Sequence, residues 1–159
     1  MESAVLCIAL ASGVCTGAAI ASPKVDVQWG PSEHYIGADL TPRDFERAKS
    51  VLTEELQNLG TKYLKPDQNL TIEVVDMGLA GHLVPRGSEG EMRVLTGRAD
   101  WPRFKLRYDL QESGRPVIAG QESIADMSYL TDLRGYSNEP FRFEQRLLED
   151  WFKKSFVEK

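Results

Sequence analysis

The sequence predicts an α/β fold of the α+β kind, a two-layer sandwich in which two helices cover one face of a four- or five-stranded sheet. Residues 103–110 alternate apolar and polar side chains, which is typical of an antiparallel strand with one buried and one solvent-exposed face. Two other segments repeat apolar residues every three or four positions along a single stripe, as helices do when they pack on one side. Both helices are therefore expected on the same face of a mixed, largely antiparallel sheet. The expected order is β-α-β-β-β-α.

The first strand and the first helix have clear sequence signals. Residues 25–29 alternate apolar and polar side chains, the period of a half-buried strand. The first helix has Thr41 as a cap and Pro42 in its first position, and it must end before Pro66. Its apolar stripe, which is expected to face the core, consists of Phe45, Ala48, Leu52, Leu56, Leu59 and Tyr63.

The middle of the chain contributes the centre of the sheet. Residues 70–75 alternate and predict a second strand. A glycine-bearing stretch and a polar loop are expected over residues 76–90, because glycine and polar residues dominate there. Residues 93–96 are expected to re-enter a sheet.

The last part of the chain predicts a hairpin and a second helix. Residues 103–110 form the clearest strand, and residues 117–124 are expected to return beside it. The helix is expected to begin with Asn138 as its cap and Pro140 in its first turn. Its apolar side is interpreted as a core face rather than a partner-binding face, and consists of Phe143, Leu147, Leu148, Trp151, Phe152 and Phe156.

Residues 1–21 resemble a signal peptide. Residues 5–20 are almost wholly apolar or small, and Ala19-Ile20-Ala21 has the small-x-small form of a cleavage site. The run is short for a spanning helix, so we expect a mature single domain over residues 22–159, outside the cytoplasm and in the periplasm. The start Met1-Glu2-Ser3 lacks the usual basic residues, which indicates a mis-chosen or truncated start. The alternative is a buried N-terminal helix.

Composition excludes several classes of protein. Both cysteines, Cys7 and Cys15, lie in the leader, and neither sits in a lipid-attachment motif, so the mature chain would have no disulfide or thiol nucleophile. Removal of the leader takes away one acidic residue, Glu2, and leaves a formal charge of −4. That acidity argues against nucleic-acid binding, which requires a dense cationic surface. The mature chain has no second hydrophobic segment, so no integral membrane segment is expected.

Four sequence blocks, in order, resemble the bacterial secreted family known as the domain of unknown function 3016. The blocks are Asp76–Gly81, Asp100–Arg103, Asp126–Leu130 and Phe143–Phe152, and the similarity extends from Val25 to Phe156. Met77-Gly78 departs from the family, which more often has a hydrophobic residue and then an acid, so no acidic ligand is carried over to position 78. The resemblance implies a Gram-negative envelope protein with a signal peptide. It implies no reaction.

Two groups of residues are candidates for a site. Asp76, His82, Asp100 and Asp126 would form a polar or metal-binding cleft if they converged, because hard cations take carboxylate oxygen ligands. The alternative is that Asp76 caps the turn by accepting hydrogen bonds from nearby backbone N–H groups, and that His82 is an ordinary loop histidine. Calcium-loop spacing is absent, so no metal or other cofactor is predicted.

The second group is a cationic row on the exposed side of residues 103–110. Arg103, Lys105 and Arg107 would hold an anionic polymer or a partner protein, while Trp101 and Tyr129 would add flat rings. The alternative is a solvated face, paired with Glu122 or Asp109 across the hairpin, where each exposed pair contributes only about 0–1 kcal/mol. The complete candidate surface consists of Asp76, His82, Asp100, Trp101, Arg103, Arg107, Asp126 and Tyr129.

These observations favour a non-catalytic envelope domain that binds an envelope polymer, a small ligand or a protein partner. The mature chain offers only His34 and His82 as imidazole bases and has no Gly-x-Ser-x-Gly motif, which argues against nucleophilic catalysis. The alternative is a small hydrolase or metal-dependent enzyme that uses Asp76, His82, Asp100 or Asp126. Convergence of those four side chains in a concave pocket would favour the enzyme.

Overall fold

The structure is a computed structural model, and it describes residues 22–31, 35, 42–87, 91–131 and 139–158. The predicted leader, residues 1–21, lies outside the described residues, as do the two predicted helix caps, Thr41 and Asn138.

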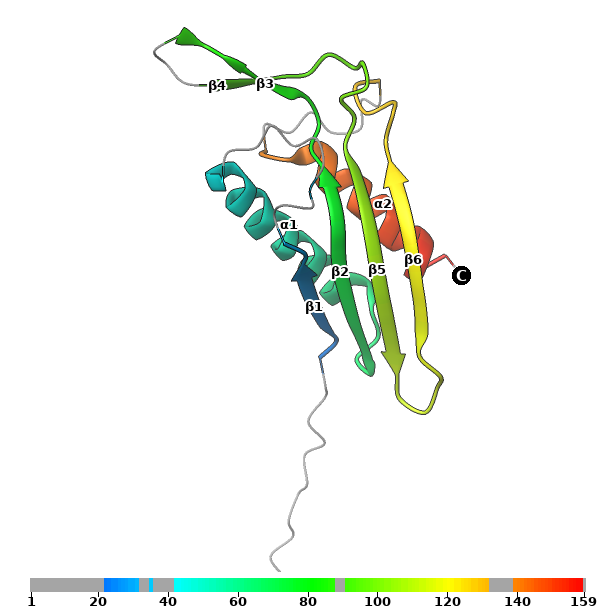
Figure 1. Cartoon of the computed structure of the whole chain (residues 1–159). Coiled ribbons are helices and arrows are strands. Elements are labelled where there is room, and N and C mark those ends of the chain that lie inside the picture. The colour runs from blue at the N-terminus through cyan, green and yellow to red at the C-terminus, as the bar shows by residue number, and fades with distance from the viewer. Residues whose placement is uncertain (1–21, 32–34, 36–41, 88–90, 132–138, 159) are drawn as a thin grey trace, which may run out of the picture.

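The main sheet has four strands in the order β1-β2-β5-β6 (Figure 1). These are β1 (Lys24–Trp29), β2 (Gln68–Gly78), β5 (Arg103–Glu112) and β6 (Ile118–Ala125). β1 runs parallel to β2, whereas the β2–β5 and β5–β6 pairs are antiparallel. The predicted mixed, largely antiparallel sheet is therefore confirmed, with four strands.

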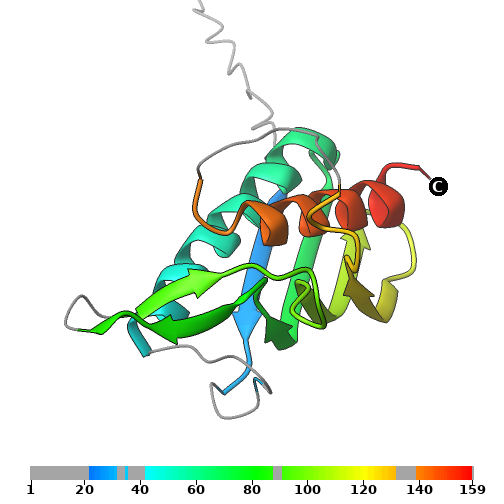
Figure 2. The ribbon, with the colours of Figure 1, turned by 90° about the horizontal axis from the view of Figure 1, so that it is seen from above.

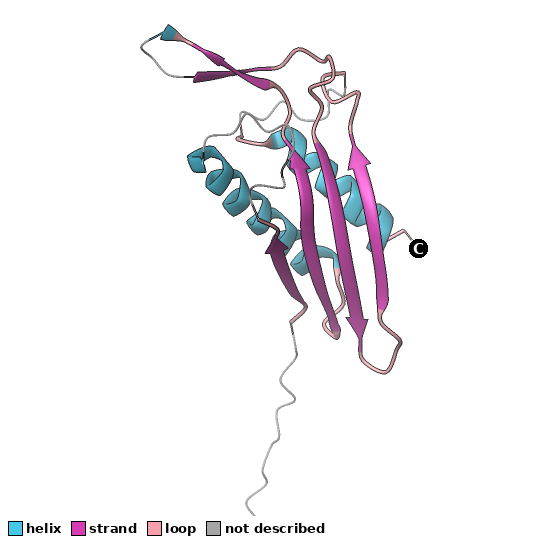
Figure 3. Ribbon diagram, viewed as in Figure 1, coloured by secondary structure: helices cyan, strands magenta, loops and turns pink. Residues whose placement is uncertain are grey.

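Both helices lie on one face of this sheet, as predicted (Figures 1 and 2). They are α1 (Pro42–Tyr63) and α2 (Arg142–Phe156). Alternation on β5 follows from this arrangement, because Phe104, Leu106, Tyr108 and Leu110 are buried under the helices while the residues between them are more exposed. The other face of the sheet carries no helix in the described part of the chain (Figure 3).

The helices bury the stripes that their spacing predicts. Ala48, Leu52 and Leu56 of α1 are completely buried. On α2, Trp151 and Phe152 are buried in the same cluster, and Phe156 packs against it. This burial confirms that the apolar side of α2 is a core face. Full burial of one such aromatic side chain contributes about 1.5–3 kcal/mol.

β2 is longer than predicted because a bulge lets it continue. The register with β5 shifts between Val74 and Asp76, so Val75 is an extra residue in the strand. Beyond the bulge, Asp76 pairs with Lys105 and Gly78 pairs with Arg103. Asp76 thus belongs to the strand and not to the loop that was expected there.

Residues 82–85 and 91–94 form a second, two-stranded sheet instead of a loop and a strand of the main sheet. β3 (His82–Pro85) pairs antiparallel with β4 (Glu91–Val94), and this β3–β4 arm extends away from the main sheet (Figure 1). Gly81 allows the turn into the arm. Its φ of 78° is left-handed, and a Cβ atom there would lie 2.5 Å from the Val94 carbonyl oxygen, so only glycine fits.

α2 begins later than predicted. The residue before it, Phe141, has φ 60° and ψ 27° and provides no side-chain cap. This left-handed conformation interrupts the helical path, so Pro140 precedes α2 instead of standing in its first turn. Such a conformation costs about 1–3 kcal/mol in a residue that is not glycine.

Neither described helix is both long and apolar enough to cross a membrane.

Candidate functional site

The predicted cationic row lies on the uncovered face of the sheet, but parts of it are engaged within the protein. Arg107 forms an ion pair with Glu73 of the neighbouring strand β2. It does not pair with Glu122, whose carboxylate instead accepts a hydrogen bond from the Tyr108 hydroxyl 3.2 Å away on the helix side of the sheet. The Arg103 side chain lies over Gly78, where a Cβ atom would come within 2.9 Å of it. Lys105 is exposed.

The predicted acids each accept local hydrogen bonds. The Asp76 carboxylate accepts one from the backbone N–H of Met77 at 2.9 Å. The Asp100 carboxylate accepts two from Thr96, one from its backbone N–H at 2.7 Å and one from its hydroxyl at 2.8 Å. Burial alone would raise the pKa of Asp100, but the Thr96 bonds outweigh it and lower that pKa. The Asp76 contact matches the turn-capping alternative.

Asp126 and Tyr129 fasten the loop after β6 to the start of α2. The Asp126 carboxylate accepts a hydrogen bond from the Ser128 backbone N–H at 3.0 Å and pairs with Arg146 of α2 at 2.8 Å. Arg146 also donates to the Tyr129 carbonyl oxygen at 3.0 Å. The Tyr129 ring packs edge-on against Phe143 with 4.9 Å between centroids.

Tyr129 therefore cannot serve as a surface platform. Its side chain is 1% exposed, and burial raises the pKa of its hydroxyl to about 12. Its hydroxyl oxygen accepts a hydrogen bond from the Gly97 N–H at 3.3 Å. The flat-ring role proposed for Tyr129 is excluded by this burial, while Trp101 is half-buried just before β5.

The four residues of the predicted polar cleft come from different elements. Asp76 lies in β2 and His82 is the exposed first residue of β3, whereas Asp100 and Asp126 belong to the loops before β5 and after β6. Among the residues that the structure describes, no three His, Cys, Asp or Glu side chains are grouped so that they could hold a metal ion.

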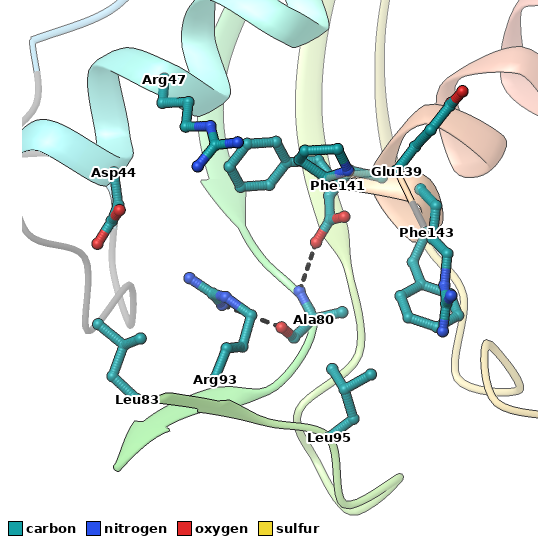
Figure 4. A pocket seen from close by; sticks show the side chains of 12 residues that line it. Asp44, Arg47, Ala80, Leu83, Arg93, Leu95, Glu139, Phe141 and Phe143 are labelled. Atoms are coloured by element: carbon teal, nitrogen blue, oxygen red, sulfur yellow. Dashed lines mark hydrogen bonds between the residues drawn. The ribbon is translucent and has the colours of Figure 1, made fainter. Parts of the chain in front are cut away.

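A different site lies where the two helices begin. A pocket of about 370 Å³ opens between the start of α1, the end of β2, the β3–β4 arm and the start of α2 (Figure 4). We call it the arginine pocket, because Arg47 of α1 and Arg93 of β4 extend into it from opposite sides. Its other polar residues are Asp44, Glu139, Arg142 and Glu144, and its apolar residues include Leu83, Leu95, Phe141 and Phe143.

A chain of hydrogen bonds forms the floor of the arginine pocket. The Glu144 carboxylate of α2 accepts a bond from the Ala80 N–H at 2.6 Å, and the Arg93 guanidinium donates to the Ala80 carbonyl oxygen at 3.0 Å. Figure 4 draws both bonds as dashed lines. Three separate elements are thus joined through one residue between β2 and β3.

Glu144 is the most unusual titratable residue of the site. Its side chain is 2% exposed, and burial raises its pKa, although the Ala80 N–H bond and the charge of Arg93 act in the opposite direction. Titratable groups whose pKa is shifted by burial are common in functional pockets.

Arg47 is the most available charge of the site. It is exposed on α1, and no hydrogen bond or ion pair connects it to any described residue. Asp44, Glu139 and Arg142, by contrast, all take part in further interactions within the protein. The Arg47 guanidinium is thus available to an external partner, and Arg93 keeps N–H donors besides the one that binds the Ala80 carbonyl oxygen.

Sequence reasoning missed this site, although one signal was present. Glu144 lies four residues before Leu148 and eight before Phe152, so an acidic residue falls on the apolar stripe of a helix. Such a residue needs a buried partner. The identity of that partner, Ala80, depends on how β2 ends beside α2, which no local pattern reveals.

The chain matches a protein-family model described as "Protein of unknown function (DUF3016)" over residues 23–154. This match covers most of the chain, and the chain belongs to that family. No curated protein matches the sequence.

Proposed function

We propose that this member of the DUF3016 family is exported to the periplasm and acts there as a non-catalytic binding domain, with the arginine pocket as its ligand site. The apolar run of residues 5–20 and the Ala19-Ile20-Ala21 sequence support export. The pocket supports binding, since small-molecule sites are concave, mostly apolar and about 300–1,000 Å³ in volume.

The walls of the arginine pocket favour an organic anion with an apolar portion. Guanidinium groups bind carboxylates and phosphates through paired N–H donors, and Arg47 and Arg93 present two such groups. Leu83, Leu95 and Phe143 offer apolar surface for the rest of the ligand. The observation that carries the proposal is the approach of Arg47, unpartnered among the described residues, toward Arg93 across a pocket of this size.

Three arginines, Arg47, Arg93 and Arg142, line the pocket, against Asp44, Glu139 and the buried Glu144. The Glu144 carboxylate is directed to the Ala80 N–H and its pKa is raised by burial, which favours the neutral form. Asp44 and Glu139 are engaged in interactions of their own.

Binding is better supported than catalysis. The described residues that line the pocket include no histidine, serine or cysteine, the side chains that most often form a nucleophile and its base. The alternative enzyme would depend on Asp76, His82, Asp100 and Asp126, yet the three carboxylates accept local hydrogen bonds and His82 is exposed on a different element. The cationic sheet face is a weaker site for a polymer, because Arg107 pairs with Glu73.

Calorimetric titration of residues 22–159, which contain every described helix and strand, tests the proposal. Hexanoate, hexan-1-ol and hexylamine serve as anionic, neutral and cationic probes of equal chain length. Hexanoate is expected to bind with a dissociation constant in the millimolar range, as small ligands do, and hexylamine is not expected to bind.

Two matched variants locate the site. Arg47→Gln should weaken hexanoate binding at least about tenfold, since a hydrogen bond to a charged group contributes about 1.5–3 kcal/mol. Arg107→Gln removes the same kind of charge from the sheet face and should leave the affinity unchanged. If both variants lose hexanoate affinity equally, or if Arg107→Gln alone loses it, the result would contradict the arginine pocket as the site and would favour the sheet face. Absence of binding by all three probes would contradict the proposal.

A further inference from the structure

One wall of the arginine pocket belongs to the β3–β4 arm, which is not held in place by the hydrophobic core. Among the described residues of the arm, none belongs to the core: Leu83 and Val84 are partly buried, and Met92 is 45% exposed. A two-stranded hairpin is at best marginally stable by itself in water. The arm extends away from the main sheet in Figure 1, so its position must be fixed where it joins the body.

Both chain segments at the base of the arm bind the same residue, Asp100. The chain enters the arm at Gly81, whose backbone N–H donates to the Asp100 carbonyl oxygen at 2.8 Å. It leaves the arm at Thr96, whose backbone N–H and hydroxyl donate to the Asp100 carboxylate at 2.7 and 2.8 Å. One residue therefore joins the two ends of the arm, through its main chain on one side and through its side chain on the other.

Asp100 is itself anchored to the main sheet. Pro102 is fully buried, and its carbonyl oxygen accepts a hydrogen bond from the Asp126 N–H at 3.1 Å. β5 begins at the next residue, Arg103. The bonds from Thr96 have a carboxylate as their acceptor, and hydrogen bonds to charged groups are stronger than those between neutral groups. Strong bonds therefore fasten the base of the arm to the sheet.

A second contact ties the base of the arm to α2. The Gly97 N–H donates to the Tyr129 hydroxyl oxygen at 3.3 Å, and the Tyr129 ring packs against Phe143 with 4.9 Å between centroids. Phe143 lines the arginine pocket from α2. The base of the arm is thus held relative to the helix wall of the pocket as well as to the sheet.

The base of the arm also controls the arm residues that face the pocket. Leu83 and Arg93 are cross-strand partners, and they form the second pair from the base. Facing residues of an antiparallel pair lie on the same side of the ribbon, and both of these residues line the arginine pocket. A displacement of the base would therefore be carried directly to Leu83 and Arg93.

We propose that Asp100 is a positioning residue of the arginine pocket, which fixes the arm through Gly81 and Thr96 and so holds Arg93 across the pocket from Arg47. This rests on the proposed function of the pocket. Asp100 is not one of the described residues that line the pocket, so it acts through the arm and not by contact with the ligand. A site whose groups are already in place binds more tightly, because less conformational freedom is lost on binding.

Hydrogen exchange of residues 22–159 tests whether Asp100 holds the arm. Asp100→Ala removes the acceptor of both Thr96 bonds, so the amides of residues 82–85 and 91–94 should exchange at least about tenfold faster. The amides of β2 and β5 should accelerate far less, because these strands form the centre of the main sheet. Asp100→Asn keeps an oxygen acceptor and should restore most of the protection.

Titration with hexanoate links the arm to ligand binding. The apparent affinity falls with the fraction of molecules whose arm is in place, so Asp100→Ala should raise the hexanoate dissociation constant at least about threefold. Thr96→Val removes only the hydroxyl bond, at an exposed position that tolerates valine, and should have a smaller effect of the same sign on both readouts.

Gln68→Ala is the matched control. The Gln68 side chain accepts a hydrogen bond from the Lys65 backbone N–H at 2.9 Å, a loop contact at the opposite end of β2 from the arm. This variant should leave both the exchange of the arm and the affinity for hexanoate unchanged.

Arm amides that exchange at equal rates in the wild type and in Asp100→Ala would overturn the proposal. An unchanged hexanoate affinity in Asp100→Ala, an equal loss of affinity in Gln68→Ala, or an Asp100→Asn arm as loose as that of Asp100→Ala would overturn it as well. If the wild type itself binds no hexanoate, the proposed function fails, and the exchange rates alone then decide whether Asp100 fixes the arm.

Discussion

At the scale of single residues, Glu144 joins the core to the arginine pocket. It stands on the apolar stripe of α2 between the buried side chains and the pocket, and its carboxylate binds the Ala80 N–H. Ala80 in turn accepts a hydrogen bond from Arg93. One buried acid therefore sets the position of the β2–β3 connection and, through it, of an arginine that lines the pocket.

Replacement of Glu144 by leucine is expected to destabilise the fold. Leucine fits the apolar stripe but leaves the buried Ala80 N–H without its acceptor, at a cost of about 1–3 kcal/mol. Glu144→Gln keeps an oxygen acceptor at the same place and should cost less. Chemical denaturation of both variants measures the difference, and a leucine variant as stable as the glutamine variant would contradict the role given to this bond.

The pH dependence of stability provides a second prediction for Glu144. Burial raises its pKa above the ordinary value of 4.5, so the folded chain holds this proton more tightly than the unfolded chain does. Its stabilising contribution is complete below the unfolded pKa and is lost as the pH rises through the folded pKa. Glu55, whose pKa burial also raises, adds a contribution of the same sign.

The Glu144→Gln variant isolates this contribution. Thermal melts at a series of pH values should show that the wild type loses stability relative to Glu144→Gln as the pH rises from about 4.5. Parallel curves for the two proteins over this range would mean that the Glu144 pKa is not raised.

At the scale of elements, α1 packs closely against β1 at Gly60. A Cβ atom at this position would overlap the Val25 side chain. The glycine that weakens the last turns of the helix by its own propensity thus permits the helix to pack on the parallel edge of the sheet.

Gly60→Ala is therefore expected to destabilise the protein despite the higher helix propensity of alanine. Overpacking of a core contact costs about 1–3 kcal/mol, which exceeds the gain of about 1 kcal/mol from propensity. Ser50→Ala, at an exposed position of the same helix, is the control and should be neutral or slightly stabilising. A stabilising Gly60→Ala in urea denaturation would show that α1 does not pack so closely.

Elements with a regular period were predictable from sequence, whereas those set by special backbone geometry were not. The alternation of apolar and polar residues around Leu106 predicted β5 correctly, and the apolar stripe through Leu52 predicted α1. Both patterns arise because each element buries only one side. The β3–β4 arm was missed because its strands pair with each other beyond Gly81 and bury no regular face. The late start of α2 was missed because nothing in the sequence marks Phe141 as left-handed.

At the scale of the whole molecule, the arginine pocket exists because four distant segments meet at one end of the sandwich. Asp44 and Arg47 open α1, Ala80 follows β2, Arg93 lies in the arm and Glu144 begins the buried stripe of α2. The sequence shows each residue type, but only the antiparallel return of β5 and the shared face of the two helices bring them together. The sequence blocks led to Asp76, Asp100 and Asp126, which accept local hydrogen bonds and do not line this pocket.

The proposed export predicts a defined mature N-terminus. Protein recovered from the periplasm should begin at Ser22, because cleavage is expected after Ala21. N-terminal sequencing measures this directly. A cytoplasmic protein that retains residues 1–21 would contradict the proposed location and would favour the alternative of an N-terminal helix.

The central claim is that the arginine pocket holds an organic anion, and a crystal structure of residues 22–159 grown with hexanoate tests it most directly. The account predicts a carboxylate between the guanidinium groups of Arg47 and Arg93, with its alkyl chain against Leu83 and Leu95. Hexanoate bound on the open sheet face near Arg107, with the pocket left to water, would contradict the claim.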